Sequence, residues 1–363
     1  MASLSDMRKQ ERAEFLNDAG WGAATARPLA GDASTRSYER LEMGGRRALL
    51  MNAPPKAETA PCPPEASPAE RRRLGYNALA RLAGPNLNAF IAIAETLRRA
   101  GLSAPAIYAA DAARGFAVIE DLGDDLFVRA IPAGADEEAL YSAAIDALLM
   151  LRKAAPAAPK SAQYTMLSYD RTALESEIAL IPEWYWPHVK GEAATADVIA
   201  DYAAAWAPVL DRLTPPSTVL LRDYHAENLL WLPGRQGAAR VGVIDFQDGL
   251  VGAPAYDLVS LLEDARRDVS PALADRMIAR YCAGAAALGA FDEDAFRRDF
   301  AILAAQRNAK ILGIFARLVR RDRKPRYLDF LPRVEAMFRR DLEDEALAPL
   351  RQFFARNFPE LAP

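Results

Sequence analysis

The sequence predicts an α/β (α+β) fold in two lobes: an N-terminal lobe with an antiparallel sheet and a helix, and a mostly helical C-terminal lobe. Three observations support this prediction. Strand-like runs dominate before Glu120, and long helical periods dominate after it. In the second half, two short apolar runs, 219–221 and 241–244, each lead into an aspartate. We therefore predict an N-terminal lobe at 1–120 and a C-terminal lobe at 121–363, with the junction near 120–124.

The bulk composition narrows the class of protein. The 363 residues are 51% hydrophobic and 26% charged, which is typical of a globular chain with room for two subdomains. A net charge of −4 gives no general affinity for nucleic acid or for membranes. The cysteines, Cys62 and Cys282, lack metal-ligand spacing, and the N-terminus lacks the apolar core of a signal peptide. We expect a cytoplasmic protein without an obligate protein partner.

The first lobe begins with an amphipathic helix at 5–19, followed by strands at 24–29 and 46–51. The residues between these strands, 31–40, include the small or hydroxylated Gly31, Ser34 and Thr35. Such a hairpin tip can offer backbone N–H groups and hydroxyls to phosphate oxygens, and a plain hairpin turn is the alternative.

The rest of the first lobe contains a loop, a helix and two strands. Residues 52–68 carry six prolines, which predicts an irregular loop that is either disordered or a cover over a binding site. A helix at 88–100 and strands at 105–110 and 115–119 follow. The last strand leads into the acidic, glycine-containing segment 120–125.

The second lobe reads as a series of helices, and one segment of it has a composition suited to sugars. Helical periods cover 137–155, 195–213, 272–287 and 294–317, and 349–363 reads as a short tail. Between the first two helices, Asp170, Glu177 and Trp184 combine carboxylates with a flat aromatic face, as a sugar-binding surface does. The alternative is structural: Asp170 is a plausible helix N-cap, and Trp184 a plausible core residue.

A basic stripe lies on the predicted helix 294–317. At about 100° per residue, Arg307, Lys310 and Arg317 fall on one face. This face either is solvated or lines the site of an anionic substrate.

The two apolar runs of the second lobe carry the clearest chemical pattern. Asp223 follows the first run, Asn228 lies five residues later, and Asp245 follows the second run. If the two runs form adjacent strands, these side chains meet at one point. Two carboxylates and an amide offer the oxygen ligands that Mg²⁺ prefers. The spacing also matches the D-x-x-x-x-N of a kinase catalytic loop followed by a metal-binding aspartate.

With these motifs in place, the chain resembles the aminoglycoside phosphotransferase/choline kinase branch of the protein-kinase-like fold. Within that branch it is similar to the anomeric kinases of N-acetylmuramate and N-acetylglucosamine in peptidoglycan recycling. The closer similarity rests on Gly31-Asp-Ala-Ser34, Met51-x-Ala-Pro-Pro55, Arg222-Asp-Tyr-His225-x-x-Asn228 and Gln306-Arg307-x-x-Lys310-x-Leu-Gly313-Ile-Phe-Ala-Arg317. The resemblance covers nearly the whole chain.

The resemblance implies ATP and Mg²⁺ as cofactors and an amino sugar as the small-molecule substrate. It implies that residues 1–120 bind the nucleotide through Gly31, Ser34 and Thr35, and through the backbone of Glu120 and Leu122. It implies Asp223 as the catalytic acceptor of the hydroxyl proton, with Asn228 and Asp245 on the metal. Asp170, Glu177, Trp184, Arg307 and Lys310 are then expected at the substrate, and Arg222, His225 and Asp257 as structural support of the catalytic loop.

The chain departs from the kinase pattern at one place. A kinase carries a phosphate-binding lysine on the strand that corresponds to 46–51, and this strand holds none. Arg47, Lys56 or an arginine of the hairpin tip could replace it, and the sequence leaves this choice open. A different small-molecule kinase and a non-catalytic nucleotide-binding module therefore remain as alternatives.

Overall fold

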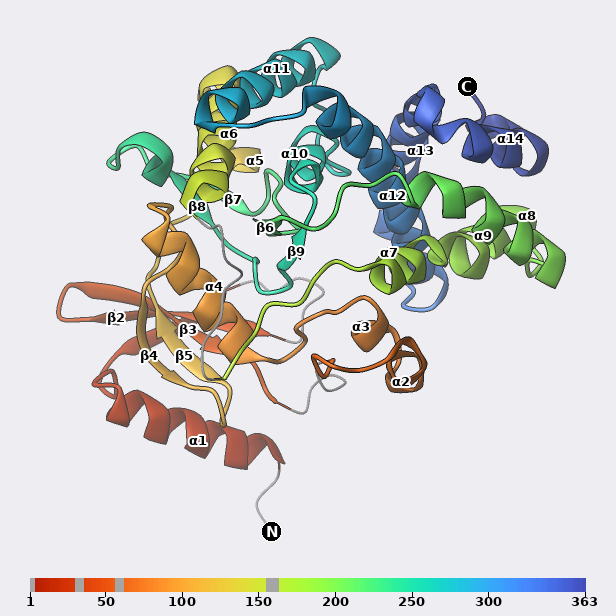
Figure 1. Cartoon of the computed structure of the whole chain (residues 1–363). Helices are drawn as coiled ribbons and strands as arrows, with labels where there is room; N and C mark the ends of the chain where they lie inside the picture. Colours follow the sequence, from red (N-terminus) through yellow and green to blue (C-terminus); the bar gives the residue numbers. More distant parts are fainter. Residues whose placement is uncertain (1–3, 30–35, 56–61, 155–162) are drawn as a thin grey trace.

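The computed structural model describes the whole chain except residues 1–3, 30–35, 56–61 and 155–162 (Figure 1). A five-stranded sheet occupies the first third of the chain, and helices make up most of the remainder. This confirms the predicted α/β (α+β) class with a sheet-bearing N-terminal lobe and a mostly helical C-terminal lobe. The sheet ends at Ile119, while the boundary between the lobes at residue 120 stays a prediction.

The sheet of the N-terminal lobe is antiparallel throughout, with strand order β1-β2-β3-β5-β4. Its strands are β1 (Thr25–Pro28), β2 (Ser37–Met43), β3 (Arg46–Asn52), β4 (Ile107–Asp111) and β5 (Phe116–Ile119). The β1–β2 pair forms the expected hairpin. Its tip at 30–35, with Gly31, Ser34 and Thr35, lies outside the described residues.

Two helices cover the two faces of this sheet. Helix α1 (Leu4–Asp18) packs Phe15 and Leu16 against Leu50 and Phe116. Helix α4 (Leu87–Arg99) lies on the opposite face, where Phe90 and Ile93 share one core with Met51 and Ile119. Because neighbouring strand residues point to opposite faces, Leu50 and Met51 enter different cores.

Two short helices follow the proline-rich segment, and the sequence analysis missed both. These are α2 (Pro68–Leu74) and α3 (Tyr76–Leu79). Ser67 and Glu70 form a capping box at the start of α2, and Pro68 occupies its first turn. This S-x-x-E spacing with a proline at the first helical position was the signal that could have predicted α2.

Residues 67–83, named here the α2–α3 segment, make polar contacts with the C-terminal lobe. Arg71, only 1% exposed, and Arg81 bind the carboxylate of Asp170 at 2.6 and 3.0 Å. Arg222 donates to the carbonyl of Ala80 at 3.0 Å. The backbone N–H of Ala83 donates to Asp248 at 2.6 Å. A segment that belongs to the first lobe by sequence is therefore bound to the second lobe by charge and hydrogen bonds.

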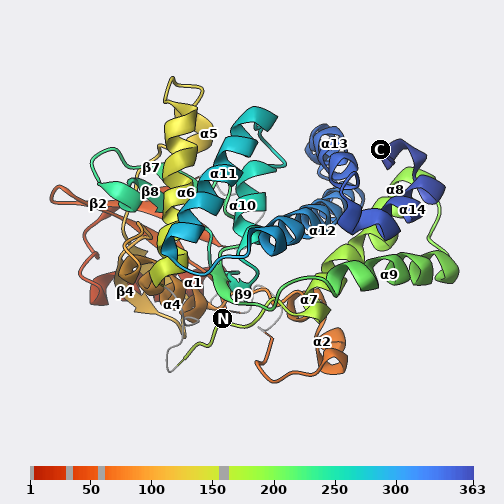
Figure 2. The same cartoon turned by 45° about the horizontal axis from the view of Figure 1, so that its top comes forward.

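The C-terminal lobe is assembled around one long helix, α12 (Glu293–Arg320) (Figures 1 and 2). It contacts α7, α10 and α13, and its face from Ile302 to Ala316 is largely buried. The other α-helices are α5 (Phe127–Ala130), α6 (Glu137–Ala154), α7 (Arg171–Ile178), α8 (Trp186–Lys190), α9 (Ala196–Leu210), α10 (Ala255–Leu262), α11 (Pro271–Leu288), α13 (Leu331–Asp341) and α14 (Ala348–Asn357). A π-helical turn, η1 (Ile181–Tyr185), joins α7 to α8, and 3₁₀ turns lie at η2 (Gly237–Arg240), η3 (Pro325–Phe330), η4 (Glu345–Leu347) and η5 (Pro359–Leu361).

The predicted tail at 349–363 is wrong. Residues from Ala348 form α14, and Phe353, Phe354 and Phe358 are at most 1% exposed in the main core. Pro349 marked the first helical turn here, where a proline is well tolerated. Helices α8, α9, α13 and α14 gather at the end of the molecule where the C-terminus lies (Figures 1 and 2).

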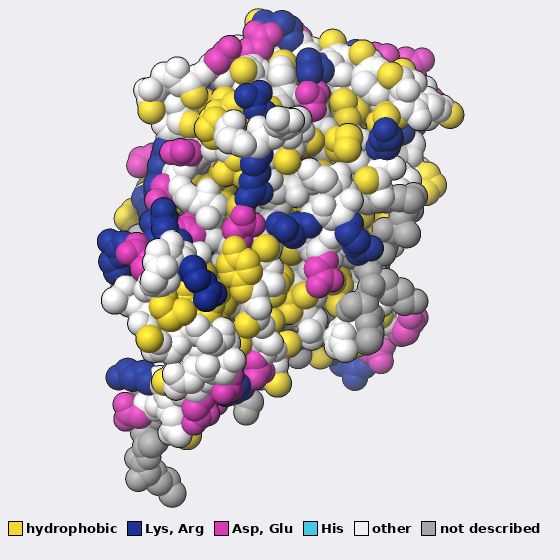
Figure 3. All heavy atoms as spheres, turned by 90° about the vertical axis from the view of Figure 1, so that its left-hand side faces the viewer, with side chains coloured by type: hydrophobic (Ala, Val, Ile, Leu, Met, Phe, Trp, Pro, Cys, Tyr) yellow, Lys and Arg dark blue, Asp and Glu magenta, His cyan; other side chains and the backbone are white. Residues whose placement is uncertain are grey.

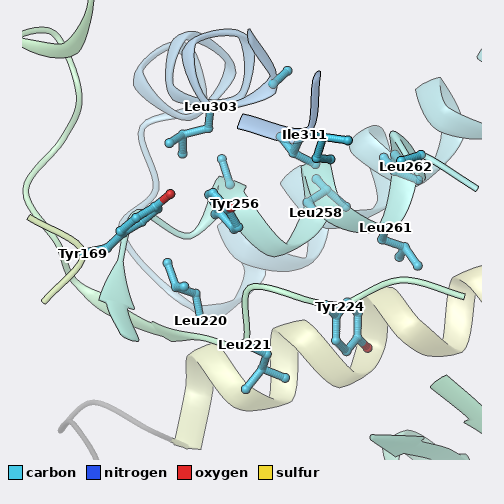
Figure 4. Close-up of a cluster of buried hydrophobic side chains, with 14 of the residues drawn as sticks. Tyr169, Leu220, Leu221, Tyr224, Tyr256, Leu258, Leu261, Leu262, Leu303 and Ile311 are labelled. Carbon is cyan, nitrogen blue, oxygen red and sulfur yellow. The ribbon is translucent and has the colours of Figure 1, made fainter. Parts of the chain in front are cut away.

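The strands that carry the acidic motif form two small sheets. Strand β6 (Thr218–Leu220) pairs with β9 (Leu250–Gly252), and β7 (Leu229–Trp231) pairs with β8 (Val241–Val243). The expectation that the two apolar runs are adjacent strands is therefore wrong, because β6 and β8 each pair with another strand. Leu220 and Leu221 anchor the end of β6 in the core, close to Tyr169, Tyr224 and Tyr256 (Figure 4).

The surface agrees with the near balance of charge. On the face in Figure 3, basic and acidic side chains are interspersed with apolar atoms, and no large patch of one sign stands out. Within the described part of the chain, no helix is both long enough and apolar enough to cross a membrane.

Candidate active site

The loop between β6 and β7 holds Asp223 and is fixed by hydrogen bonds within and around it. The buried carboxylate of Asp257, on α10, accepts from the backbone N–H groups of Leu221 and Arg222 at 2.7 and 2.9 Å. The side chain of Asn228 donates through Nδ2 to the carbonyl of Asp223 at 2.9 Å. Asp257 therefore anchors the start of the loop, and Asn228 closes it around Asp223.

Arg222 adopts a left-handed backbone conformation with φ of 68°, which a non-glycine residue seldom occupies. Its guanidinium is buried and turns back to Ala80 and Glu177. The backbone turn thus sends Arg222 into the interior, and the next residue, Asp223, is partly exposed.

Asp245 stands on the other side of the site, just after β8. It also has a positive φ, 57°, and its side chain is 46% exposed. The N–H of Ile244 donates to the carbonyl of Asn228 at 3.1 Å, so the two segments are joined directly behind these side chains. The structure therefore brings Asp223, Asn228 and Asp245 together, as the spacing predicted.

The donor set at this point suits Mg²⁺. The Nδ2 atom of Asn228 is bound to its own loop, so the amide oxygen is left for a ligand. Asp245 adds a partly exposed carboxylate, and both are oxygen donors of the kind that Mg²⁺ selects. Among the described residues there is no cluster of three or more His, Cys, Asp or Glu side chains suited to a metal. Two protein ligands fit an ion that is held largely by substrate phosphates and water.

The charges around Asp223 favour its ionised form. Desolvation alone would raise its pKa, but the positive charges of Lys310, His225, Arg222 and Arg307 outweigh burial and hold the pKa below its ordinary value. For Asp245 the balance is opposite: desolvation raises its pKa, Arg36 opposes this, and the neighbouring charge of Asp223 raises it further. Asp223 is thus the stronger acid of the two.

A largely buried network includes Arg222, the residue before Asp223, and is centred on Glu177. Arg222 and Lys310 bind one oxygen of this carboxylate, the latter at 3.2 Å, and Tyr169 and Gln306 donate to the other. Desolvation would raise the pKa of Glu177, and the charges of Lys310 and Arg222 reverse this and lower it. Because both oxygens already accept two donors, Glu177 positions Arg222 and Lys310, and its contact with a substrate stays a prediction without support from the geometry.

The other residues expected at the substrate are engaged in different ways. Asp170 caps α7 through the N–H of Ala173 and binds two arginines of the α2–α3 segment. Trp184 lies in the π-turn η1 and packs against the main core. Arg307 is 5% exposed and donates to the carbonyl of Glu263 at 3.0 Å.

Lys310 and Arg317 complete the basic stripe on α12. Lys310 contacts both Glu177 and the hydroxyl of Tyr256, the latter at 3.3 Å. Burial works against its charge, yet Glu177 and Tyr256 raise the pKa of Lys310 above its ordinary value. Arg317 lies two turns further along, with its guanidinium 4.9 Å from the ring centre of Tyr76. In the described part of the chain its buried Nε has no hydrogen-bond partner.

His225 lies within the loop between β6 and β7, with 5% of its surface exposed. Its Nε2 is 3.4 Å from the side-chain nitrogen of Asn228, and its buried Nδ1 has no partner among the described residues. Burial lowers the pKa of His225. An imidazole packed next to Asn228 fits the supporting role expected for it.

The segment after β5 lies against the small sheet that leads to Asp245. Leu122 is buried, and a Cβ on Gly242 of β8 would stand 3.4 Å from its side chain. Glu120 is held by Arg98 and Arg235 at 3.3 and 2.5 Å. The structure thus places Glu120 and Leu122 near the strand that precedes Asp245, as a hinge requires.

The arrangement of Asp223, Asn228 and Asp245 is compatible with phosphoryl transfer, and the chain was compared with a family of phosphotransferases. The model of the phosphotransferase enzyme family matches residues 25–293. The chain belongs to the phosphotransferase enzyme family. This confirms the resemblance drawn from the motifs and makes the protein an enzyme rather than a non-catalytic module.

Individual relatives of this phosphotransferase point the same way. It is 49% identical to an N-acetylmuramate/N-acetylglucosamine kinase of Caulobacter vibrioides, over 98% of each chain. It is 32% identical to a kinase of the same name from Pseudomonas putida, over 88% of this chain and 85% of that one. Among solved structures, it resembles a microcompartment-associated aminopropanol kinase with a TM-score of 0.59 at 14% identity, over 93% of this chain and 98% of that one. At that identity the match shows the shared fold.

Proposed function

We propose that this phosphotransferase uses ATP to phosphorylate the anomeric hydroxyl of N-acetylmuramate, N-acetylglucosamine or both, which yields the sugar 1-phosphate. The observation that carries the proposal is the 49% identity, over 98% of both chains, to a relative named for these two sugars. Such a reaction would place the enzyme in the recycling of cell-wall sugars.

The proposed transfer is direct. The anomeric oxygen forms a bond to the γ-phosphorus of ATP, the bond from that phosphorus to the bridging oxygen breaks, and ADP leaves. Asp223 orients the hydroxyl and accepts its proton, a role that suits a carboxylate whose pKa is held low by Lys310, His225, Arg222 and Arg307 after burial is overcome. Asn228 and Asp245 would hold Mg²⁺, which neutralises phosphate charge as the transfer proceeds.

The remaining roles extend this proposal. The backbone of Glu120 and Leu122 would pair with adenine, and Gly31, Ser34 and Thr35 would meet the phosphates. Lys310, beside Asp223, and Arg307, behind it, would line the sugar side with positive charge. Asp170, at the start of α7, and Trp184, in η1, would border the sugar, and Glu177 would hold Lys310 in place.

The charges at the site favour a neutral or anionic substrate over a cationic one. The groups that act on Asp223 include Arg307 and the pair of Arg222 and Lys310, which share the single negative charge of Glu177. A protonated amine, as on an aminoglycoside or a choline-like substrate, would be repelled by these groups, whereas an N-acetylated sugar carries no such charge. This observation supports the amino sugars within the wider family.

The test is to incubate the protein with ATP, Mg²⁺ and each sugar, and to locate the product phosphate by phosphorus NMR. We expect a resonance coupled to the anomeric proton. A phosphate on the 6-hydroxyl, or transfer only to aminoglycosides, would contradict the proposed substrate but leave the phosphotransferase fold untouched.

A further inference from the structure

The cation that a kinase-like strand supplies to the phosphates is missing from β3. The residues of β3 that face the α4 side are Leu49 and Met51, which are apolar. At the start of the strand, Arg47 is bound to Asp121 at 2.9 Å, and Arg46 lies over the ring of Trp21 at 4.5 Å. Glu95 on α4, where a kinase would hold the partner of that lysine, is exposed. The described part of β3 therefore has no cation placed at the metal residues.

Another arginine of the N-terminal lobe, Arg36, does reach the expected metal ligand Asp245. Arg36 directly precedes β2, and its Nη2 lies 3.4 Å from Oδ1 of Asp245 across 209 positions of sequence. The side chain of Arg36 is 14% exposed, so it is enclosed between the lobes although it comes from the end of a hairpin. Gln247 donates to the same oxygen at 3.0 Å.

The position of Tyr38 indicates that the contact between Arg36 and Asp245 lies in a packed region of the protein. Tyr38 lies two residues after Arg36 on the same face of β2, and it packs against the main core. Burial raises the pKa of Tyr38, and Arg36 and Asp245 both act on the same hydroxyl. Arg36, Tyr38 and Asp245 therefore lie together where the nucleotide-binding lobe meets the expected metal ligand.

We propose that Arg36 is the phosphate-binding cation of this enzyme and takes the place of the missing strand lysine. Without nucleotide its guanidinium neutralises Asp245. When ATP binds with its metal, Asp245 is taken up by the ion, and Arg36 turns to the β- and γ-phosphate oxygens next to it. A guanidinium suits this task because it is always charged and can bind two oxygens at once.

This proposal separates the candidates that the sequence left open. Arg47 is held at the hinge by Asp121, and Lys56 lies outside the described residues. Arg36 alone of the arginines at the hairpin tip that the structure describes contacts a metal residue. The proposal rests on the phosphotransferase family and is independent of which sugar is phosphorylated.

The test uses the full chain without any sugar, so that the substrate assignment cannot affect it. Affinities for adenosine, ADP and a non-hydrolysable ATP analogue are measured by calorimetry, with Mg²⁺ and with a chelator, for the wild type, Arg36→Ala and Arg36→Lys. The matched control is Arg27→Ala, whose ion pair with Glu42 at 2.5 Å lies on the same hairpin with 70% of the arginine side chain exposed.

We expect Arg36→Ala to bind the ATP analogue about ten- to a hundredfold more weakly, the range for a hydrogen bond to a charged group. Adenosine affinity should stay unchanged, Arg36→Lys should recover part of the loss, and Arg27→Ala should match the wild type. A loss below twofold for the ATP analogue, or an equal loss for adenosine, overturns the proposal. If the circular dichroism spectrum of Arg36→Ala shows that this variant is misfolded, the same affinities are measured for Arg36→Lys and Arg36→Gln. These two variants then test the proposal by the same criteria.

Discussion

At the scale of single residues, Asp223 and Asp245 have different surroundings. Substituting each of them should therefore affect the enzyme in a different way. The charges of Lys310, Arg222 and Arg307 act on Asp223, whereas the side chain of Asp245 is half-exposed and contacts Arg36. We propose that Asp223 accepts a proton and that Asp245 holds a cation. Replacing each by asparagine keeps its shape and removes its charge, so the two roles can be separated.

We expect Asp223→Asn to fold and to bind ATP with Mg²⁺ while turnover falls by roughly 10²–10⁴-fold, the contribution of general-base catalysis. Asp245→Asn should instead weaken the binding of nucleotide that depends on Mg²⁺. Steady-state kinetics and calorimetry check both outcomes. If both variants keep near wild-type turnover, the assignment of Asp223 and Asp245 is wrong.

Arg317 differs from the other members of the basic stripe. Arg307 binds a carbonyl and Lys310 is paired with Glu177, whereas Arg317 rests on Tyr76 with its Nε unpartnered among the described residues. If the sugar is N-acetylmuramate, its lactyl carboxylate can meet this guanidinium. At 1.5 Å per residue, the backbone of Arg317 lies about 10 Å further along α12 than that of Lys310.

Arg317→Gln should therefore lower kcat/KM for N-acetylmuramate by about tenfold or more, the effect of one charge-assisted contact, and leave N-acetylglucosamine nearly unchanged. Arg320→Gln, an exposed neighbour bound to the carbonyl of Pro187 at 2.9 Å, serves as the control. Equal losses of kcat/KM for the two sugars would mean that Arg317 does not bind the lactyl carboxylate.

At the scale of elements, α12 is held close to the turn that follows α7. A Cβ on Gly313 would lie 2.3 Å from Cβ of Leu180 and 2.7 Å from its carbonyl carbon and oxygen. This contact is with backbone, which cannot swing away. The glycine therefore allows α12 to approach η1, which carries Trp184.

Gly313→Ala should destabilise the protein by about 1–3 kcal/mol, as overpacking does, despite the gain of about 1 kcal/mol in helix propensity. Gly284→Ala in α11 is the matched control, because its Cβ would also meet an atom at 2.3 Å, but that atom is the end of the flexible Leu149 side chain. Urea unfolding should show Gly284→Ala near neutral. Two equal losses would show that backbone contact is not the cause.

Much of the fold was predictable from periodicity, and the errors have physical causes. Strands β1, β3, β4 and β5 and helices α4, α6, α11 and α12 have apolar residues at clear spacing, so they were found, whereas β2 was not named as a strand. Helices α2 and α3 are short and lack such a pattern, and α14, which has Pro349 in its first turn, was taken for a tail. The pairing of β6 with β9 depends on contacts far apart in sequence, which periodicity does not contain.

The contacts of the candidate site also fall into those that the sequence could predict and those that it could not. The spacing of Asp223, Asn228 and Asp245 reflects a local loop and a following strand, so the sequence could predict that they meet. The partners of Glu177 come from α12 and the catalytic loop, and those of Asp170 from the α2–α3 segment. These tertiary contacts engage both carboxylates within the protein, and only the folded chain shows them.

At the scale of the whole molecule, the Glu177 network joins α7, α12 and the catalytic loop through ionised groups in the interior. The folded state lowers the pKa of Glu177, because Lys310 and Arg222 together outweigh its desolvation. A depressed acid contributes stability that is fully present above its unfolded pKa and is lost as pH falls through its folded pKa. This contribution is therefore present at neutral pH and disappears below about pH 4.5.

Glu177→Gln should lower the free energy of unfolding at pH 7 by about 3–5 kcal/mol, the cost of removing one partner of a buried pair. The difference from the wild type should shrink as the pH falls from 4.5 through the lower folded-state pKa of Glu177, because protons bind the unfolded chain first and the folded carboxylate only at lower pH. Urea titrations from pH 3.5 to pH 7 measure this. Glu175→Gln, an exposed neighbour on α7 paired with Arg171, should differ little at any pH, and a pH-independent gap for Glu177→Gln would contradict the argument.

The contacts of the α2–α3 segment have a consequence for motion. Enzymes with two lobes commonly rotate them about a hinge as the nucleotide binds and leaves. Here Arg71, Arg81, Ala80 and Ala83 are bound to Asp170, Arg222 and Asp248, so the segment should travel with the C-terminal lobe while the sheet moves against it. Tyr76 and Arg317 would then keep their stacking through the cycle. The α2–α3 segment and the C-terminal lobe would then present the same surface to the sugar in the open and the closed enzyme. Only the part of the site formed by the N-terminal sheet, where ATP is expected, would change shape.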